Sequence, residues 1–120
     1  MAAVTPAPGK LPVEYDNGLG QISKPLDQIR ERTFVSATGT ITRIASSGPA
    51  SAVRATIVVT GPAGDTAYCS LDADTRRNYS ASLREGARVM VRGTVRYLPD
   101  NRPVIDVLAV HDLDRQITAL

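Results

Sequence analysis

Arginine is the side chain whose abundance in this sequence points most directly to chemistry. The 120 residues include twelve arginines and only two lysines, although the formal net charge is +2. A planar guanidinium binds phosphates and carboxylates through paired hydrogen bonds, so an arginine-rich chain suits those ligands. A GC-rich coding bias produces the same excess. The placement of the arginines therefore matters more than their number.

Two neighbouring segments place arginine and tyrosine on one side of a predicted sheet. VRATIVVT and TAYCSL alternate in a way that predicts half-buried strands. Their outward residues include Arg54, Thr56, Tyr68 and Ser70, and Arg43 extends this surface on the preceding strand. We expect Arg54 to pair with a phosphate and Tyr68 to stack on a base, a combination that suits single-stranded nucleic acid. The alternative is an ordinary exposed sheet face, since threonine and tyrosine form strands readily.

A second row of arginines follows period two in ARVMVRGTVRY. Arg88, Arg92 and Arg96 project to one side, and Arg102 lies in the following turn. Successive arginines of the row stand about 13 Å apart at a rise of ~3.3 Å per residue, so they could follow a nucleic-acid backbone. The alternative is an outer face on which arginine pairs with Asp106 of the next strand.

Catalytic and metal-binding chemistry is not indicated. The chain has a single cysteine, Cys69, and a single histidine, His111, so a cysteine-based metal cluster or a disulfide cannot form within it. Cys69 alternates inward and is expected to be a buried small hydrophobe. His111 lies in the acidic segment HDLD and is expected at the surface. We therefore expect a protein that is not an enzyme and that has no cofactor or metal.

The elements that position these residues are predicted to be five strands and one helix. The first strand is FVSATGTITRI, in which Gly39 predicts a bend or bulge. Between the third and fourth strands, DADTRRNYSASL loses the alternation and predicts a short helix that Asp72 or Asp74 caps. Tyr79 and Leu83 form the buried side of this helix. The order is β-β-β-α-β-β.

Two phrases within this order carry a family resemblance. The first strand reads TGTITRI, and the fourth follows LREGARVMVRGTVRY. They resemble the "hydrophobic, Gly, x, hydrophobic" and "Leu-x-x-Gly-x-x-Val-x-Val-x-Gly" patterns of OB-fold nucleic-acid-binding domains, especially the anticodon-binding-like and single-strand-binding branches. Over residues 33–113 the resemblance implies an all-β, five-stranded Greek-key barrel. It also implies a non-catalytic domain that binds single-stranded DNA or RNA around strands one to three. A small SH3-like barrel is the rival architecture.

The remaining segments flank the barrel. Residues 1–22 are rich in proline and glycine and predict a flexible or extended arm. Residues 23–32 predict a short helix with Leu26 and Ile29 on one face, and residues 114–120 predict a polar tail. No apolar run reaches the ~20 residues of a transmembrane helix, and the N-terminus lacks a secretory pattern. We therefore expect a cytoplasmic protein without membrane contact.

Protein interaction is the alternative function. Single-strand binders usually display several exposed rings, whereas this chain has one Phe, four Tyr and no Trp. The arm and its helix could pack across the barrel or onto a partner. The chain would then be an OB-fold protein-interaction module, a homo-oligomer or one subunit of a larger complex.

Overall fold

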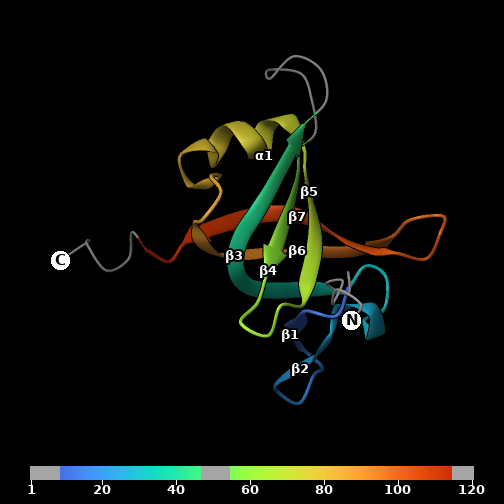
Figure 1. Ribbon diagram of the computed structural model, residues 1–120. Helices are drawn as coiled ribbons and strands as arrows, with labels where there is room; N and C mark the ends of the chain where they lie inside the picture. Colours follow the sequence, from blue (N-terminus) through green and yellow to red (C-terminus); the bar gives the residue numbers. More distant parts are fainter. Residues whose placement is uncertain (1–8, 47–54, 115–120) are drawn as a thin grey trace, which may run out of the picture.

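The computed structural model describes residues 9–46 and 55–114 (Figure 1). The strands are β1 Pro12–Asp16, β2 Gln21–Pro25, β3 Phe34–Ser46, β4 Ala55–Thr60, β5 Thr66–Leu71, β6 Arg88–Tyr97 and β7 Pro103–Asp112. The helical segments are η1 Leu26–Gln28, α1 Ala73–Asn78 and η2 Ser80–Ser82. In these two described ranges, no helix has the length and apolar character needed to cross a membrane.

Strands β3 to β7 form a closed barrel. Their hydrogen-bonded order is β3-β4-β5-β7-β6, and β6 returns to β3 to complete the ring. Only β5 and β7 pair in parallel; the other barrel pairs are antiparallel. With α1 between the third and fourth barrel strands, this is the five-stranded Greek-key barrel predicted from the sequence.

Strand β3 closes the barrel because its two halves have different partners. Residues 34–40 pair with β6, and residues 40–46 pair with β4. Gly39 lies where the partner changes, and a Cβ atom at this position would lie 2.6 Å from the carbonyl oxygen of Thr60. The close approach requires glycine, and the predicted bend is visible in the strong curvature of β3 (Figure 1).

A β-bulge follows the bend and changes the phase of β3. Ile41 pairs with Val59, whereas Arg43 pairs with Val58, so Thr42 is an extra residue on β3. Thr42 and Arg43 are both exposed. Strict alternation after the buried Ile41 would point Arg43 inward, and the bulge instead places it on the outer face, where the sequence analysis expects it.

Alternate residues of the barrel strands fill the interior. The burial patterns of β4, β5 and β6 confirm the predicted inward residues, and fully buried side chains include Ile57, Cys69, Leu71, Val89, Val91 and Ile105. The predicted cap of α1 is also confirmed, because the Asp72 carboxylate accepts a 2.8 Å hydrogen bond from the Thr75 amide. Tyr79 and Leu83 pack against the core beside α1.

The N-terminal segment differs from its prediction. β1 and β2 form a hairpin, and β1 pairs with β3 through Glu14 and Ser36. This hairpin replaces the expected flexible or extended arm within residues 12–22, and the three-residue η1 replaces the helix expected over 23–32. The physical reason is that four apolar side chains of this segment are buried in the same core as the barrel. None of them is more than 3% exposed: Leu11, Val13, Leu26 and Ile29.

Candidate nucleic-acid interface

A row of paired residues crosses the outer face of the barrel. Arg43 pairs with Val58, Val58 with Tyr68, Tyr68 with Val104, and Val104 with Arg96. Neighbouring strands lie about 4.8 Å apart, so the backbones of Arg43 and Arg96 each stand about 10 Å from that of Tyr68. Val58 and Tyr68 beside Arg43 are half-buried, whereas Val104 between Tyr68 and Arg96 is buried. The row thus brings Tyr68 close to Arg43 on the exposed part of this face.

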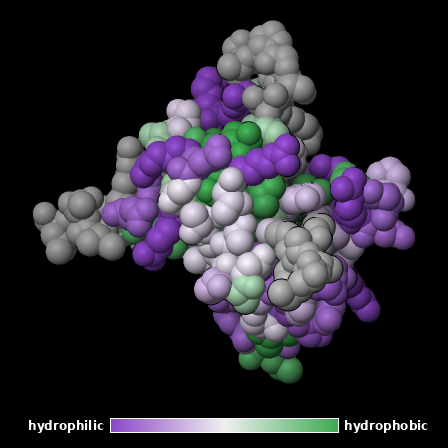
Figure 2. All heavy atoms as spheres, in the orientation of Figure 1, coloured by the Kyte–Doolittle hydropathy of each residue, from purple (hydrophilic) through white to green (hydrophobic). Residues whose placement is uncertain are grey.

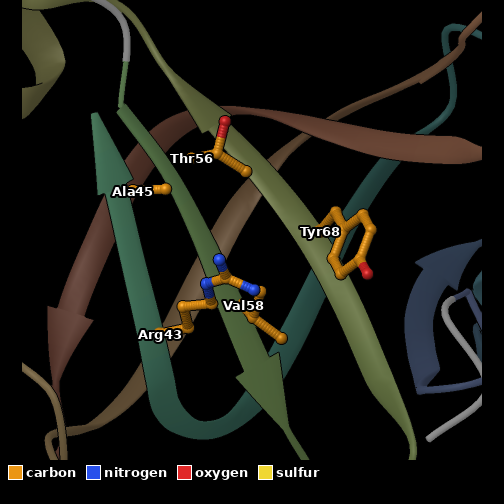
Figure 3. A pocket seen from close by; sticks show the side chains of 5 residues that line it. All are labelled: Arg43, Ala45, Thr56, Val58 and Tyr68. Atoms are coloured by element: carbon orange, nitrogen blue, oxygen red, sulfur yellow. The ribbon is translucent and has the colours of Figure 1, made fainter. Parts of the chain in front are cut away.

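Two open hollows meet at Tyr68. The first has a volume of about 210 Å³ and is lined by Arg43, Ala45, Thr56, Val58 and Tyr68 (Figure 3). The second, of about 530 Å³, shares three of these residues and adds Thr42, Thr60, Gly64 and Thr66. We call the residues that line either hollow the Tyr68 face. In Figure 2 the surface over β3 to β5 combines hydrophobic side chains with side chains of intermediate hydropathy, and strongly hydrophilic side chains lie around it.

Arg43 and Tyr68 present polar groups on this face. Within residues 9–46 and 55–114, Arg43 makes no ion pair and the Tyr68 hydroxyl makes no hydrogen bond. Figure 3 shows Arg43 extending from β3 toward Val58 of β4, while the Tyr68 ring projects from β5. A free guanidinium beside a half-exposed ring is the pair of groups that a phosphate and a base require.

The hydroxyl residues predicted for the site lie close to Tyr68. Thr56 is exposed and pairs in register with the half-buried Ser70. The hydroxyls of Thr42 and Thr60 lie 2.9 Å apart, and both line the second hollow. Alternation along FVSATGTITRI and VRATIVVT also places Thr42 and Thr60 outward, but neither side chain is charged or aromatic, so they are not among the predicted site residues.

The predicted arginine row on β6 lies on the outside of the barrel, but two of its three arginines already contact a neighbouring side chain. Arg96 donates to both Asp106 oxygens, from Nε at 2.7 Å and from Nη2 at 3.0 Å, and this hydrogen bonding raises the pKa of Arg96. The alternative pairing with Asp106 is therefore confirmed for Arg96. The Arg92 guanidinium carbon lies 5.6 Å from the centroid of the Phe34 ring, a cation–π distance.

Arg88 and Arg102 are not among the residues that line the Tyr68 face. In the turn between β6 and β7, Arg102 pairs with Asp100 at 2.6 Å. Arg88 lies beside the bend of β3, in a third hollow with Thr38, Thr40 and Thr60. Arg54 falls outside the described residues.

The single cysteine and histidine lie away from this surface. Cys69 is fully buried, and burial raises its pKa to about 12. His111 is half-buried on β7, where it pairs with Met90, rather than fully at the surface as expected. Across the described part of the chain, no three His, Cys, Asp or Glu side chains gather as a metal site.

The barrel order and the helix position define an OB-fold domain. The chain is similar to the second single-stranded DNA-binding protein of Mycobacterium smegmatis, with a TM-score of 0.57 and 19% identity over 71% of this chain and 92% of that one. It is also similar to Rim1, a mitochondrial single-stranded DNA-binding protein of S. cerevisiae, with a TM-score of 0.54 and 14% identity over 70% and 96%. These likenesses confirm the predicted resemblance in fold.

A third solved structure agrees with these two. It is a small single-stranded DNA-binding protein from Streptomyces coelicolor, with a TM-score of 0.50 and 26% identity over 72% of this chain and 99% of that chain. No family model matches the sequence, and no curated protein matches it. The likeness therefore comes from the structure.

Proposed function

We propose that this chain binds single-stranded nucleic acid on the Tyr68 face, without catalysis. The observation that carries the proposal is that Arg43, which has no ion-pair partner among the described residues, lies next to the half-exposed Tyr68, with only Val58 between them in the register. The fold supports it, since the similar solved structures are named as single-stranded DNA-binding proteins.

Each residue of the face has a distinct part in this binding. A base stacks on the Tyr68 ring, while the Arg43 guanidinium pairs with a neighbouring phosphate. Val58 supplies apolar contact beneath the base, and the exposed Thr56 hydroxyl hydrogen-bonds to sugar or phosphate. A single stacked base contributes ~1–3 kcal/mol and tolerates any sequence, so binding is modest in affinity and weak in sequence preference.

A fluorescence-anisotropy titration tests this function. Labelled oligothymidylate and a duplex of the same length are titrated with the protein at two salt concentrations. We expect binding that prefers the single strand and weakens with salt, because arginine–phosphate contacts release counterions. A preference for the duplex, or no binding at low salt up to high micromolar protein, would contradict the proposal.

Self-association is a second candidate function, favoured by a separate surface. Phe34 on β3 is 47% exposed and Leu108 on β7 is 61% exposed. Arg92 of β6 lies on the strand between them and contacts the Phe34 ring. Aromatic residues and arginine are enriched in protein interfaces. Sedimentation velocity tests it: a dimer that Leu108→Ser dissociates would support contact between two copies, and a monomer at every concentration would contradict it.

A further inference from the structure

The Tyr68 face continues into a third hollow. This hollow has a volume of about 340 Å³ and is lined by Thr38, Gly39, Thr40, Thr60, Gly61, Pro62, Arg88 and Leu113. Thr60 also lines the second hollow on the Tyr68 face. The hollows therefore follow one another from Thr56, past Tyr68 and Thr60, to Arg88, around the bend of β3.

The position of Arg88 is fixed by the strand crossing at this bend. Thr40 pairs with Thr60 of β4 on one side and with Arg88 of β6 on the other. Gly39 lets the two strands approach closely at this crossing, since a Cβ atom there would lie 2.6 Å from the carbonyl oxygen of Thr60. The guanidinium of Arg88 and the hydroxyl residues at positions 38, 40 and 60 thus come to one hollow from three strands.

The charge of Arg88 is available to a ligand. Its side chain is exposed and makes no ion pair with a carboxylate in the described ranges. Asp114 contacts the Arg88 backbone instead, because the Arg88 amide donates to Asp114 Oδ2 at 3.4 Å. A guanidinium with neighbouring threonine hydroxyls is the donor set that proteins direct at phosphate oxygens.

We propose that a strand bound on the Tyr68 face continues past Thr60 and places a phosphodiester against Arg88. The inference rests on the proposed function and adds the direction of the strand. It differs from the path along β6 that the spacing of Arg88, Arg92 and Arg96 predicts. Arg96 forms an ion pair with Asp106, and Arg92 contacts the Phe34 ring. Arg88 instead lines the hollow that adjoins the Tyr68 face.

Oligonucleotide length separates this path from binding at Tyr68 alone. Single OB domains cover about 4 to 16 nucleotides, so we choose oligothymidylates of about 4 and about 16 nucleotides. The variant is Arg88→Gln, and the matched control is Arg92→Gln, which removes another outward arginine of the same strand. Anisotropy titrations at several salt concentrations give the slope of log affinity against log salt for each protein.

We expect Arg88→Gln to reduce the slope by about 0.7 for the long oligonucleotide, the value of one phosphate contact on a single strand. The short oligonucleotide should bind the variant as it binds the wild type, and Arg92→Gln should change neither slope. Arg88→Lys should retain the slope on the long oligonucleotide.

Other results overturn the inference in distinguishable ways. If both oligonucleotides bind and Tyr68→Ala weakens them, but Arg88→Gln leaves both slopes unchanged, the path past Thr60 is wrong and the proposed function stands. An equal loss with Arg88→Gln on both lengths also contradicts the path. If the wild type binds neither oligonucleotide, the proposed function fails and the inference fails with it.

Discussion

Arg43 and Tyr68 pair with the same residue, Val58, from opposite sides. This relationship depends on the bulge at Thr42, which turns Arg43 out of the core and brings it into phase with the outward residues of β4 and β5. One extra residue in β3 thus brings a guanidinium and an aromatic ring to the same surface.

Loss of the Arg43 charge should lower the salt dependence of single-strand binding. We expect Arg43→Gln to reduce the slope of log affinity against log salt by about 0.7, since one phosphate contact is lost. The control is Arg96→Gln with Asp106→Asn, which removes a satisfied ion pair without changing net charge. Equal slopes for Arg43→Gln and wild type would remove Arg43 from the site.

The N-terminal hairpin and the η1 segment that follows it should be part of the folding unit. Leu26 is fully buried in the barrel core, so Leu26→Ala should lower the free energy of unfolding by about 2–5 kcal/mol, measured by urea denaturation. The matched control is Leu19→Ala at the hairpin tip, where the side chain is 96% exposed, and its effect should stay within about 0.5 kcal/mol. Similar urea midpoints for the two variants would contradict this packing.

Burial of Cys69 should make stability fall at alkaline pH. Its pKa is raised from 9.0 to about 12 in the folded protein, so above pH 9 the unfolded chain loses a thiol proton that the folded chain keeps. The unfolded state then binds fewer protons, and the free energy of unfolding decreases as pH rises, by at most ~1.4 kcal/mol per pH unit.

Cys69→Ala separates the contribution of the Cys69 thiol to the pH dependence of stability from the contributions of the other titrating groups. Urea denaturation of both proteins between pH 7 and about pH 10.5, above the ordinary thiol pKa of 9.0, gives the comparison. The variant should lose less stability over this range than the wild type does. Parallel pH profiles for the two proteins would show that the thiol ionises equally in both states.

Much of the barrel follows from alternation along the sequence. Apolar residues at every second position identify the inward side of β4, β5 and β6, and the loss of that pattern locates α1. Tyr68 is predicted outward by the same pattern, and the structure agrees because its neighbours Ala67 and Cys69 are fully buried. Alternation between inward and outward residues depends only on neighbouring positions in the chain, so it can be recognised in the sequence itself.

The hairpin of β1 and β2 has a recognisable sequence pattern, but the pattern covers only a few residues. Val13 and Tyr15 alternate with acidic residues, and Asn17-Gly18 is a strong turn signal. The turn is held by Asp16, which accepts a 2.8 Å hydrogen bond from the Gly18 amide. Two five-residue strands among many prolines and glycines resemble an arm until the buried side chains that hold them to the barrel are known.

The sequence pattern does not show which arginines have a side-chain partner in the folded barrel. Spacing places Arg88, Arg92 and Arg96 on one side of β6, but it does not show which partners the adjacent strands supply. Asp106 reaches Arg96 because β7 pairs Asp106 with Thr94, two positions before Arg96. Long-range register decides which cations are free, and it is set by the closure of the whole barrel.

The most direct test of the account compares two aromatic substitutions in one titration. Tyr68→Ala removes the ring on the Tyr68 face, and Phe34→Ala removes an exposed ring of the separate β3–β6–β7 surface. Affinity for labelled oligothymidylate is measured by fluorescence anisotropy. We predict that Tyr68→Ala weakens binding by about 5- to 150-fold, the ~1–3 kcal/mol of one stacked base, while Phe34→Ala binds as the wild type does. Unchanged affinity for Tyr68→Ala, or a larger loss for Phe34→Ala, would contradict the central claim.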